Sequence, residues 1–229
     1  MHLANAFDAN RDRSRGAAVD PLPDIGSPTH WIDQAIGPRY ERCTLGNFQT
    51  SFEGQRVAVE QCRDYVANFP RYASEGRNLL FIGPKGTGKD HLMVAVVREI
   101  CNRMPPRQSG ARRRVVYRDG LVLFSEFRSM ISSRKNEDKL IEGYAEPHLL
   151  ALSDPLPPAG SLSDYERRMM HRVIDARYRQ LRPTTATINV ANRAELDSRM
   201  TPQTSDRLCD FAIVVSCNWE SYRQRKVTK

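Results

Sequence analysis

Short runs of apolar residues alternate along the chain with longer stretches in which apolar residues recur at helical spacing. The short runs predict strands at 78–83, 112–118, 148–154, 184–191 and 211–216, and those at 78–83 and 148–154 are predicted to be buried. The longer stretches predict helices at 53–68, 91–104, 121–134 and 163–181. Because strands that alternate with helices imply parallel crossovers, we expect a three-layer α/β fold around a central parallel sheet.

The start of the chain differs from the rest. Residues 1–36 are polar and rich in Asp, Arg, Gly and Pro, which predicts a disordered N-terminal arm. Trp31 and Ile32 are candidate anchors if this arm folds on a partner. Residues 37–229 contain the alternating pattern and are expected to form one domain.

Composition narrows the class of protein. No apolar run approaches the ~20 residues needed to cross a bilayer, and the N-terminus has no apolar signal segment, so we expect a cytoplasmic protein with no membrane association. The five cysteines form no CxxC pair, which is typical of reduced thiols rather than of a disulfide framework or a zinc site. The net charge of +8 suits a polyanionic partner such as nucleic acid, and it equally suits a merely soluble surface.

The residues with the clearest chemistry follow the first predicted strand. The Gly-x-x-x-x-Gly-Lys pattern of a Walker A loop runs from Gly83 to Lys89, between a strand and a helix as the motif requires. Its glycines let the backbone wrap around phosphate, successive N–H groups form an anion nest, and the lysine ammonium reaches the terminal phosphates. A glycine-rich turn alone does not explain all these residues in register. We therefore predict that ATP is bound by Gly83, Pro84, Lys85, Gly86, Thr87, Gly88, Lys89, Asp90 and His91.

One residue of the loop departs from the rule. A Ser or Thr normally follows the lysine, because its hydroxyl holds Mg²⁺. Here that residue is Asp90, whose carboxylate is a hard oxygen donor that can ligate Mg²⁺ but also brings negative charge close to the phosphates. Asp90 is therefore a predicted Mg²⁺ ligand as well as part of the ATP site.

The motifs together resemble one family. The segments RYERCTLGNF, GPKGTGKDHL, HLLALSDPL, RPTTATINVAN, SDRL and NWESYR occur in the order seen in bacterial helicase loaders of the DnaC type and the related IstB transposition ATPases. The resemblance runs from about Pro38 to Arg223 and implies a P-loop NTPase fold of the AAA+ type. It also implies binding of ATP with Mg²⁺ and of single-stranded DNA, a replicative helicase or transposase as partner, and a homo-oligomer on DNA.

The resemblance assigns candidate catalytic residues. HLLALSDPL matches the Walker B strand, which normally ends in two acids and here ends in Ser153 and Asp154. In one alignment Ser153 takes the metal position and Asp154 the place of the catalytic acid. In the other, Asp154 takes the metal role and Pro155 the place of the base. Asp154 is thus predicted both as a catalytic residue and as a Mg²⁺ ligand, and Asn189 is predicted as the sensor 1 residue.

A trans-acting arginine is the last catalytic candidate. Arg207 matches the family's arginine finger, although it is equally interpreted as a surface residue paired with Asp206 or Asp210. The family usually has a second Arg four residues earlier, where this chain has Gln203. Together with the changes in the loop and at Walker B, this substitution predicts slow or absent ATP hydrolysis.

Candidate DNA contacts lie further along the chain. Ser163 and Tyr165 fall where the loader resemblance places contacts to single-stranded DNA, and Tyr165 is alternatively a half-buried helix residue. The basic residues near them can neutralise phosphates or simply form a solvated face. They are Arg112, Arg113, Arg114, Arg167, Arg168, Arg172, Arg177, Arg179 and Arg182.

Three functions remain open at this point. The chain is an ATP-binding AAA+ protein that acts on single-stranded DNA in replication or transposition, or a catalytically inactive adaptor on the same fold, or a small-molecule kinase. NWESYR and the sensor-like strand suit an AAA+ protein better than a kinase.

Overall fold

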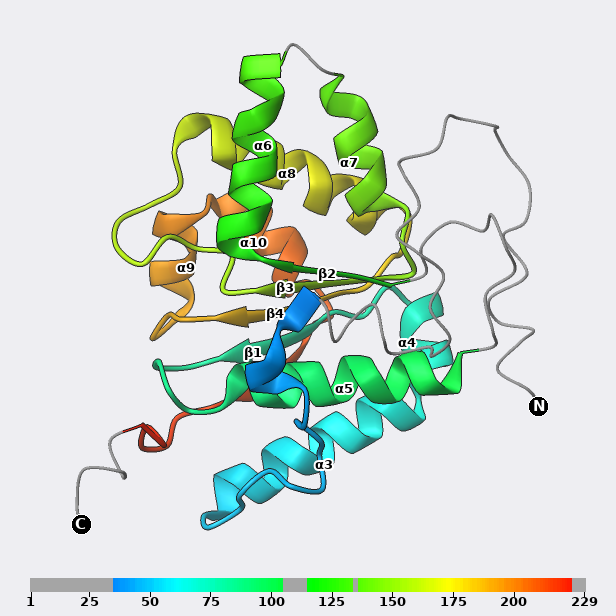
Figure 1. Ribbon diagram of the computed structural model, residues 1–229, viewed down its shortest axis with the longest axis vertical. Helices are drawn as coiled ribbons and strands as arrows, with labels where there is room; N and C mark the ends of the chain where they lie inside the picture. Colours follow the sequence, from blue (N-terminus) through cyan, green and yellow to red (C-terminus); the bar gives the residue numbers. More distant parts are fainter. Residues whose placement is uncertain (1–34, 105–114, 134–135, 224–229) are drawn as a thin grey trace.

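The computed structural model of the chain describes residues 35–104, 115–133 and 136–223 (Figure 1). The predicted N-terminal arm therefore lies outside the described residues, except for residues 35 and 36, which are helical. Ile36 is buried in the main core, so it belongs to the packed domain rather than to the arm.

A five-stranded parallel sheet forms the centre of the domain. Its strands are β1 (Leu79–Ile82), β2 (Val115–Asp119), β3 (Leu149–Ser153), β4 (Thr184–Ile188) and β5 (Ile213–Ser216), in the order β2-β3-β4-β1-β5. Four strands lie within predicted runs, and β2 extends one residue beyond the run predicted at 112–118. The expected three-layer α/β fold with a central parallel sheet is confirmed.

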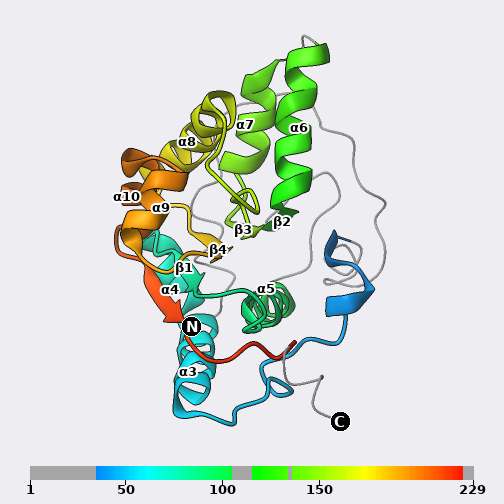
Figure 2. The ribbon, with the colours of Figure 1, turned by 90° about the vertical axis from the view of Figure 1, so that its left-hand side faces the viewer.

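Helices cover both faces of the sheet (Figure 1). On one face lie α3 (Glu53–Ala67) and α5 (Lys89–Arg103), with α4 (Phe69–Ser74) beside them. The other face is covered by α6 (Gly120–Ser133), α7 (Glu137–Ala145), α8 (Asp164–Arg179), α9 (Arg193–Arg199) and α10 (Pro202–Cys209). The view in Figure 2 shows the same two layers edge-on, with the lead-in around η1 (Pro38–Tyr40) on the side of α5.

Alternation along the strands divides the core between these two layers. In β1, Leu79 and Phe81 belong to the cluster beneath α3 and α5, whereas Leu80 belongs to the cluster beneath α6 and α8. All three side chains are fully buried, as expected for a central strand with a helix on each face.

The predicted helices at 53–68, 91–104, 121–134 and 163–181 are present, whereas α4, α7, α9 and α10 lie in segments where no helix was predicted. Within the first helix, Val57 is exposed and Gln55 is completely buried, contrary to the apolar spacing. Gln55 instead accepts a hydrogen bond from the Phe52 amide at 2.9 Å and so caps α3. None of the helices in the described part of the chain is long and apolar enough to cross a membrane.

Candidate nucleotide site

The loop that connects β1 to α5 has the backbone of an anion nest. Gly83, Gly86 and Gly88 have φ values of 149°, 84° and 87°, which side chains with a Cβ rarely adopt. Crowding adds a second reason for glycine at position 88, because a Cβ there would lie 2.7 Å from the ring of Phe48. The loop leads directly into the N-terminus of α5, whose free N–H groups and dipole favour an anion.

Lys89 lies in the first turn of α5 and folds back over this loop. Its Nζ donates to the carbonyl oxygens of Gly83 at 2.8 Å and Pro84 at 2.6 Å. The side chain is buried, and this burial lowers the pKa of the ammonium below its usual 10.5. The structure thus places a poorly hydrated positive charge at the loop, as the sequence predicts.

Asp90, the next residue, turns away from the loop toward the ends of two strands. Its Oδ1 accepts hydrogen bonds from Ser153 Oγ and from Thr187 Oγ1, each at 2.8 Å. Tyr117 on β2 joins this network through a hydrogen bond with Ser153, while burial raises the pKa of the tyrosine. Asp90 therefore ties the start of α5 to β3 and β4.

Asp154 follows β3 in a left-handed conformation with φ of 47°. Its amide donates to the Thr187 carbonyl at 3.1 Å and to Thr187 Oγ1 at 3.0 Å, which fixes the backbone after the strand. Burial raises the pKa of its carboxyl group, while a hydrogen bond from Asn189 opposes that rise. The two residues predicted as catalytic acid and sensor therefore lie near each other. Because Ser153 rather than Asp154 touches Asp90, the geometry favours the alignment in which Ser153 takes the metal position.

Two segments distant in sequence pack against the loop. From the lead-in, Phe48 makes edge-to-face contacts with His91, Trp219 and Tyr222, at centroid distances of 5.2, 6.2 and 5.8 Å. From the segment after β5, Trp219 Nε1 donates to the Thr87 carbonyl at 2.8 Å. In addition, the Tyr222 amide donates to the Gly86 carbonyl at 2.9 Å. Sequence reasoning identified NWESYR as a signature but gave these two aromatic residues no role; their position after the last strand was the available signal.

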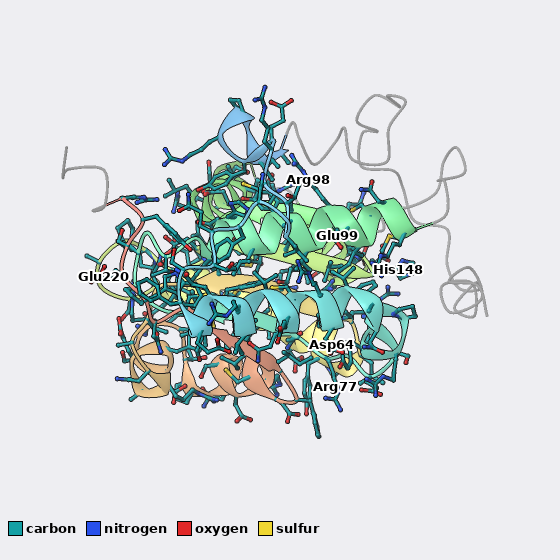
Figure 3. The ribbon with its side chains drawn as sticks, turned by 90° about the horizontal axis from the view of Figure 1, so that it is seen from below. Asp64, Arg77, Arg98, Glu99, His148 and Glu220 are labelled. Carbon is teal, nitrogen blue, oxygen red and sulfur yellow. The ribbon has the colours of Figure 1, made fainter. Side chains whose placement is uncertain are left out.

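The lead-in is itself anchored to α5. His91 Nε2 lies 2.9 Å from the Thr44 carbonyl, and burial lowers the pKa of the imidazole. Arg98, labelled in Figure 3, reaches from α5 to the carbonyls of Glu41 and Cys43. His91, a predicted ATP-site residue, thus holds the lead-in beside the loop.

Arg207 makes contacts within its own subunit. Its Nε lies 3.0 Å from Asp175 Oδ1, and its Nη1 lies 3.5 Å from His171 Nε2, both on α8. The partner is therefore neither of the two acids that the sequence suggested. The side chain is half-buried, about a third exposed, so its arginine-finger role stays a prediction.

The residues predicted to contact DNA have internal partners as well. Ser163 and Glu166 form a capping box at the start of α8, in which Ser163 Oγ accepts from the Glu166 amide at 3.3 Å. Tyr165 is half-buried, and its hydroxyl donates to the Phe127 carbonyl at 2.9 Å and lies 3.1 Å from Glu137 Oε1. Their roles in DNA binding stay predictions.

The basic run on α8 is largely neutralised. Arg172 pairs with Glu137 and Asp138, and Arg179 pairs with Asp175. Arg177 is 1% exposed, so its interpretation as a DNA-facing cation is wrong. Arg112, Arg113 and Arg114 lie outside the described residues.

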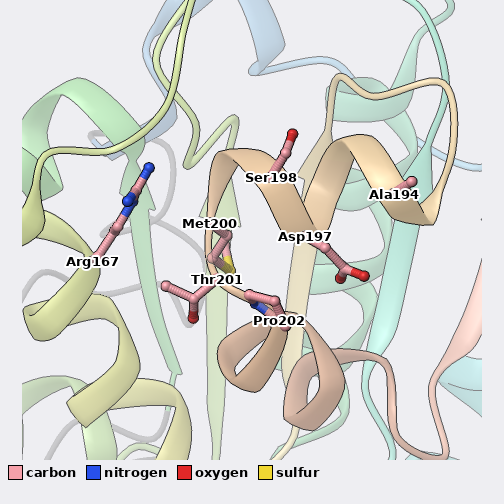
Figure 4. A pocket seen from close by; sticks show the side chains of 7 residues that line it. All are labelled: Arg167, Ala194, Asp197, Ser198, Met200, Thr201 and Pro202. Carbon is pink, nitrogen blue, oxygen red and sulfur yellow. The ribbon is translucent and has the colours of Figure 1, made fainter.

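A separate hollow of about 490 Å³ lies between α8 and the α9–α10 turn (Figure 4). Arg167 lines one side, and α9 with the start of α10 lines the other. Of the described residues that line it, none comes from the loop between β1 and α5. This hollow is therefore distinct from the candidate nucleotide site.

The strand order, the glycine nest and the buried ammonium at the start of α5 define a P-loop nucleotide-binding protein of the AAA+ type. The model of the IstB-like ATP binding protein family matches residues 51–229, and the chain belongs to this family.

Known proteins agree with this assignment. The replicative helicase loader DnaC of Escherichia coli strain K12 is 28% identical over 195 residues, which cover 85% of this chain and 74% of that protein. The crystal structure of the DnaC helicase loader superposes with a TM-score of 0.67 at 24% identity, covering 79% of this chain and 99% of that chain. A replication initiator DnaA, bound to AMPPCP and single-stranded DNA, superposes with a TM-score of 0.62 at 21% identity over 80% and 51% of the two chains. The two structural likenesses show the fold.

Proposed function

We propose that this protein binds ATP in the loop Gly83–Lys89 and uses the bound nucleotide to act on single-stranded DNA as a helper of a replicative helicase or transposase. One observation supports the nucleotide step above all: the Lys89 ammonium is buried over the glycine nest, where backbone carbonyls are its partners. Phosphate oxygens are stronger partners for such a charge than neutral carbonyls.

The donor set near the loop suits Mg²⁺. Asp90 and Asp154 are the candidate ligands, since Mg²⁺ in nucleotide sites is held by one or two carboxylates together with phosphate oxygens. When bound, the metal neutralises charge on the phosphates. Asp90 stands at the helix start, while Asn189 lowers the pKa of the Asp154 carboxyl group and so favours its ionised form.

Hydrolysis is proposed to be weak. Ser153 supplies no charge where a Walker B acid normally stands, and Arg207 is engaged with Asp175 in its own subunit. A positioned arginine contributes about 10³–10⁵ in rate in related reactions, so holding it elsewhere slows turnover strongly.

The DNA and partner steps are supported by the relatives. DnaC is a replicative helicase loader by name, and the DnaA structure contains single-stranded DNA. The surface around Ser163 and Tyr165 is the proposed DNA contact, and several copies of the chain are proposed to assemble along the strand in the cytoplasm.

Titration with fluorescent ATP tests the first step. We expect saturable binding at micromolar to millimolar nucleotide, and no saturable binding up to millimolar ATP, with or without magnesium, would refute the proposal. Fluorescence anisotropy of labelled oligo-dT, with and without ATP, then tests the DNA step, which fails if ATP leaves the affinity unchanged.

The second candidate is a catalytically inactive adaptor on the same fold. The serine at position 153 favours it, because the metal place of Walker B lacks its acid. ATP turnover separates the two candidates: the helper shows slow turnover that single-stranded DNA accelerates, whereas the adaptor shows none under either condition.

A further inference from the structure

Two departures from the P-loop pattern touch each other. Asp90, at the start of α5, and Ser153, at the end of β3, join through a hydrogen bond of 2.8 Å from the serine hydroxyl to Oδ1. Ser153 is buried, and Thr187 holds the same carboxylate oxygen from the side of β4. The two side chains are therefore hydrogen-bonded to each other within the site and are not two unrelated surface changes.

In this pair the acid and the hydroxyl stand on the opposite elements from those that carry them in other P-loop proteins. In P-loop NTPases a Ser or Thr hydroxyl after the lysine and a carboxylate at the end of the Walker B strand hold Mg²⁺. Here the carboxylate follows Lys89 and the hydroxyl ends β3. The site keeps one acid and one hydroxyl in contact, and only the elements that supply them are exchanged.

Electrostatics explains why the two changes occur together. With an acid at both positions, two carboxylates would lie within about 3 Å, and one of them would be driven to bind a proton. With a hydroxyl at both positions, neither of the two side chains would bring a negative charge to the metal. Serine at position 153 is the partner that Asp90 requires, because its hydroxyl donates to the carboxylate instead of repelling it.

We infer that Asp90 has exchanged roles with the Walker B acid, so that Asp90 is the anionic Mg²⁺ ligand of this site and Ser153 is its hydroxyl partner. This inference rests on the proposed ATP binding. Both hydroxyls that reach Asp90 approach Oδ1, and within the described part of the chain no donor is found at Oδ2. An oxygen without a donor suits a hard cation.

Four variants test the exchange, namely Asp90→Asn, Asp90→Ser, Ser153→Asp and the double variant Asp90→Ser/Ser153→Asp. The measured quantity is the ratio of the Kd for fluorescent ATP in EDTA to the Kd in Mg²⁺. The unaltered protein is expected to bind about fivefold or more tightly with Mg²⁺, within the range of coupling between contacting groups. Asp90→Asn keeps the hydrogen bonds and the shape but loses the charge, so it serves as the matched variant.

We expect Asp90→Asn and Asp90→Ser to lose the Mg²⁺ effect while still binding ATP in EDTA. Ser153→Asp is expected to weaken binding under both conditions, and the double variant is expected to recover the Mg²⁺ effect. Circular dichroism melting confirms that each variant is folded. An Asp90→Asn variant with an unchanged Mg²⁺ effect, or a folded double variant without recovery, overturns the exchange.

Different results would refute the exchange of roles and the proposed ATP binding. If the unaltered protein binds ATP equally well with and without Mg²⁺, the exchange is wrong and ATP binding stands. If no ATP binds in EDTA or in Mg²⁺, the proposed function itself is wrong.

Discussion

Arg177 is the largest side chain that is almost completely buried in the described residues. No carboxylate pairs with it there; its Nη1 donates to the carbonyls of Tyr144, Ala145 and Pro147 at 2.8, 3.1 and 2.9 Å. Its Nε donates to Thr184 Oγ1 at 3.0 Å. One guanidinium thus satisfies the carbonyls at the end of α7 and the hydroxyl at the start of β4, where unpaired polar groups would be costly.

Arg177→Lys is expected to destabilise the domain by about 3 kcal/mol, because an ammonium cannot reproduce the planar fork and leaves buried carbonyls without donors. Urea unfolding followed by circular dichroism measures this change. Arg179→Lys, on an exposed site of the same helix, is the control and should change little. Equal effects of the two substitutions would contradict the structural role of Arg177.

Lys89→Met is expected to weaken ATP binding by about tenfold to a hundredfold, because it removes charge-assisted hydrogen bonds to phosphate. Lys139→Met removes an exposed lysine of α7 on the opposite face of the sheet and serves as the charge-matched control. Calorimetric or fluorescence titration gives both Kd values. Similar losses in the two variants would show that net charge rather than the loop lysine governs affinity.

The pH dependence of binding follows from the lowered pKa of Lys89. ATP binds the ammonium form, so binding above this pKa requires uptake of a proton and the Kd rises with pH. The rise should begin below the usual lysine value of 10.5 and should be absent in Lys89→Met. A Kd that is flat across the alkaline range in the unaltered protein would contradict this protonation coupling.

At the scale of elements, the segment after β5 lies over the P-loop. Its two aromatic residues, Trp219 and Tyr222, bond to the loop carbonyls of Thr87 and Gly86. These hydrogen bonds hold the segment directly against the loop. A rearrangement of the loop is therefore expected to move Trp219 and Tyr222.

Trp31→Phe leaves Trp219 as the only tryptophan of the chain. In this variant ATP is expected to cause a saturable change in tryptophan emission, because the indole donates to the loop that receives the phosphates. The midpoint should equal the Kd measured with fluorescent ATP, and adding Lys89→Met should move it to about tenfold to a hundredfold higher ATP. Tryptophan emission that stays unchanged up to saturating ATP would show that the environment of Trp219 does not depend on the state of the loop.

The strands were predictable from their apolar runs, whereas the short helices were not predictable. Strands β1, β3 and β4 are mostly buried runs, and the edge strands β2 and β5 are partly exposed runs that keep several apolar residues, so the runs identified all five. By contrast, α9 buries only Leu196, and its start is set by the Asn192 side chain, which accepts from the Glu195 amide. A helix of fewer than two turns leaves no apolar periodicity to detect. Helix α10, which begins at Pro202 after the Thr201 cap, was also missed, because Leu208 is the one large apolar side chain that it buries.

The candidate site was predictable as a motif but not as a set of contacts. The loop and its lysine follow from residue type and spacing, since the backbone geometry is local. The bond between Asp90 and Ser153 depends on how α5 lies against the ends of β3 and β4, which no local pattern encodes. The partner of Arg207 was misjudged in the same way, because Asp175 comes from a different helix.

At the scale of the whole molecule, the role of Arg207 depends on whether copies of the chain assemble. Within one subunit the arginine pairs with Asp175 on α8, so its use by a neighbour requires that this half-buried ion pair open. A phosphate of a neighbour's nucleotide carries more negative charge than the single carboxylate of Asp175, so it can compete for the arginine. The proposed assembly on DNA therefore predicts an arginine that exchanges a carboxylate partner for a phosphate.

Mixing two variants tests this exchange. At an ATP concentration below its raised Kd, Lys89→Met carries little ATP but keeps Arg207, whereas Arg207→Ala binds ATP but lacks the arginine. If the arginine acts on the neighbouring subunit, each variant alone should fail to assemble on oligo-dT with ATP, while the mixture should form dimers that join the intact ATP site of Arg207→Ala to the intact arginine of Lys89→Met. Sedimentation velocity measures the species. If the sedimentation profile of the mixture equals the sum of the two separate profiles, Arg207 acts within its own subunit, where it pairs with Asp175.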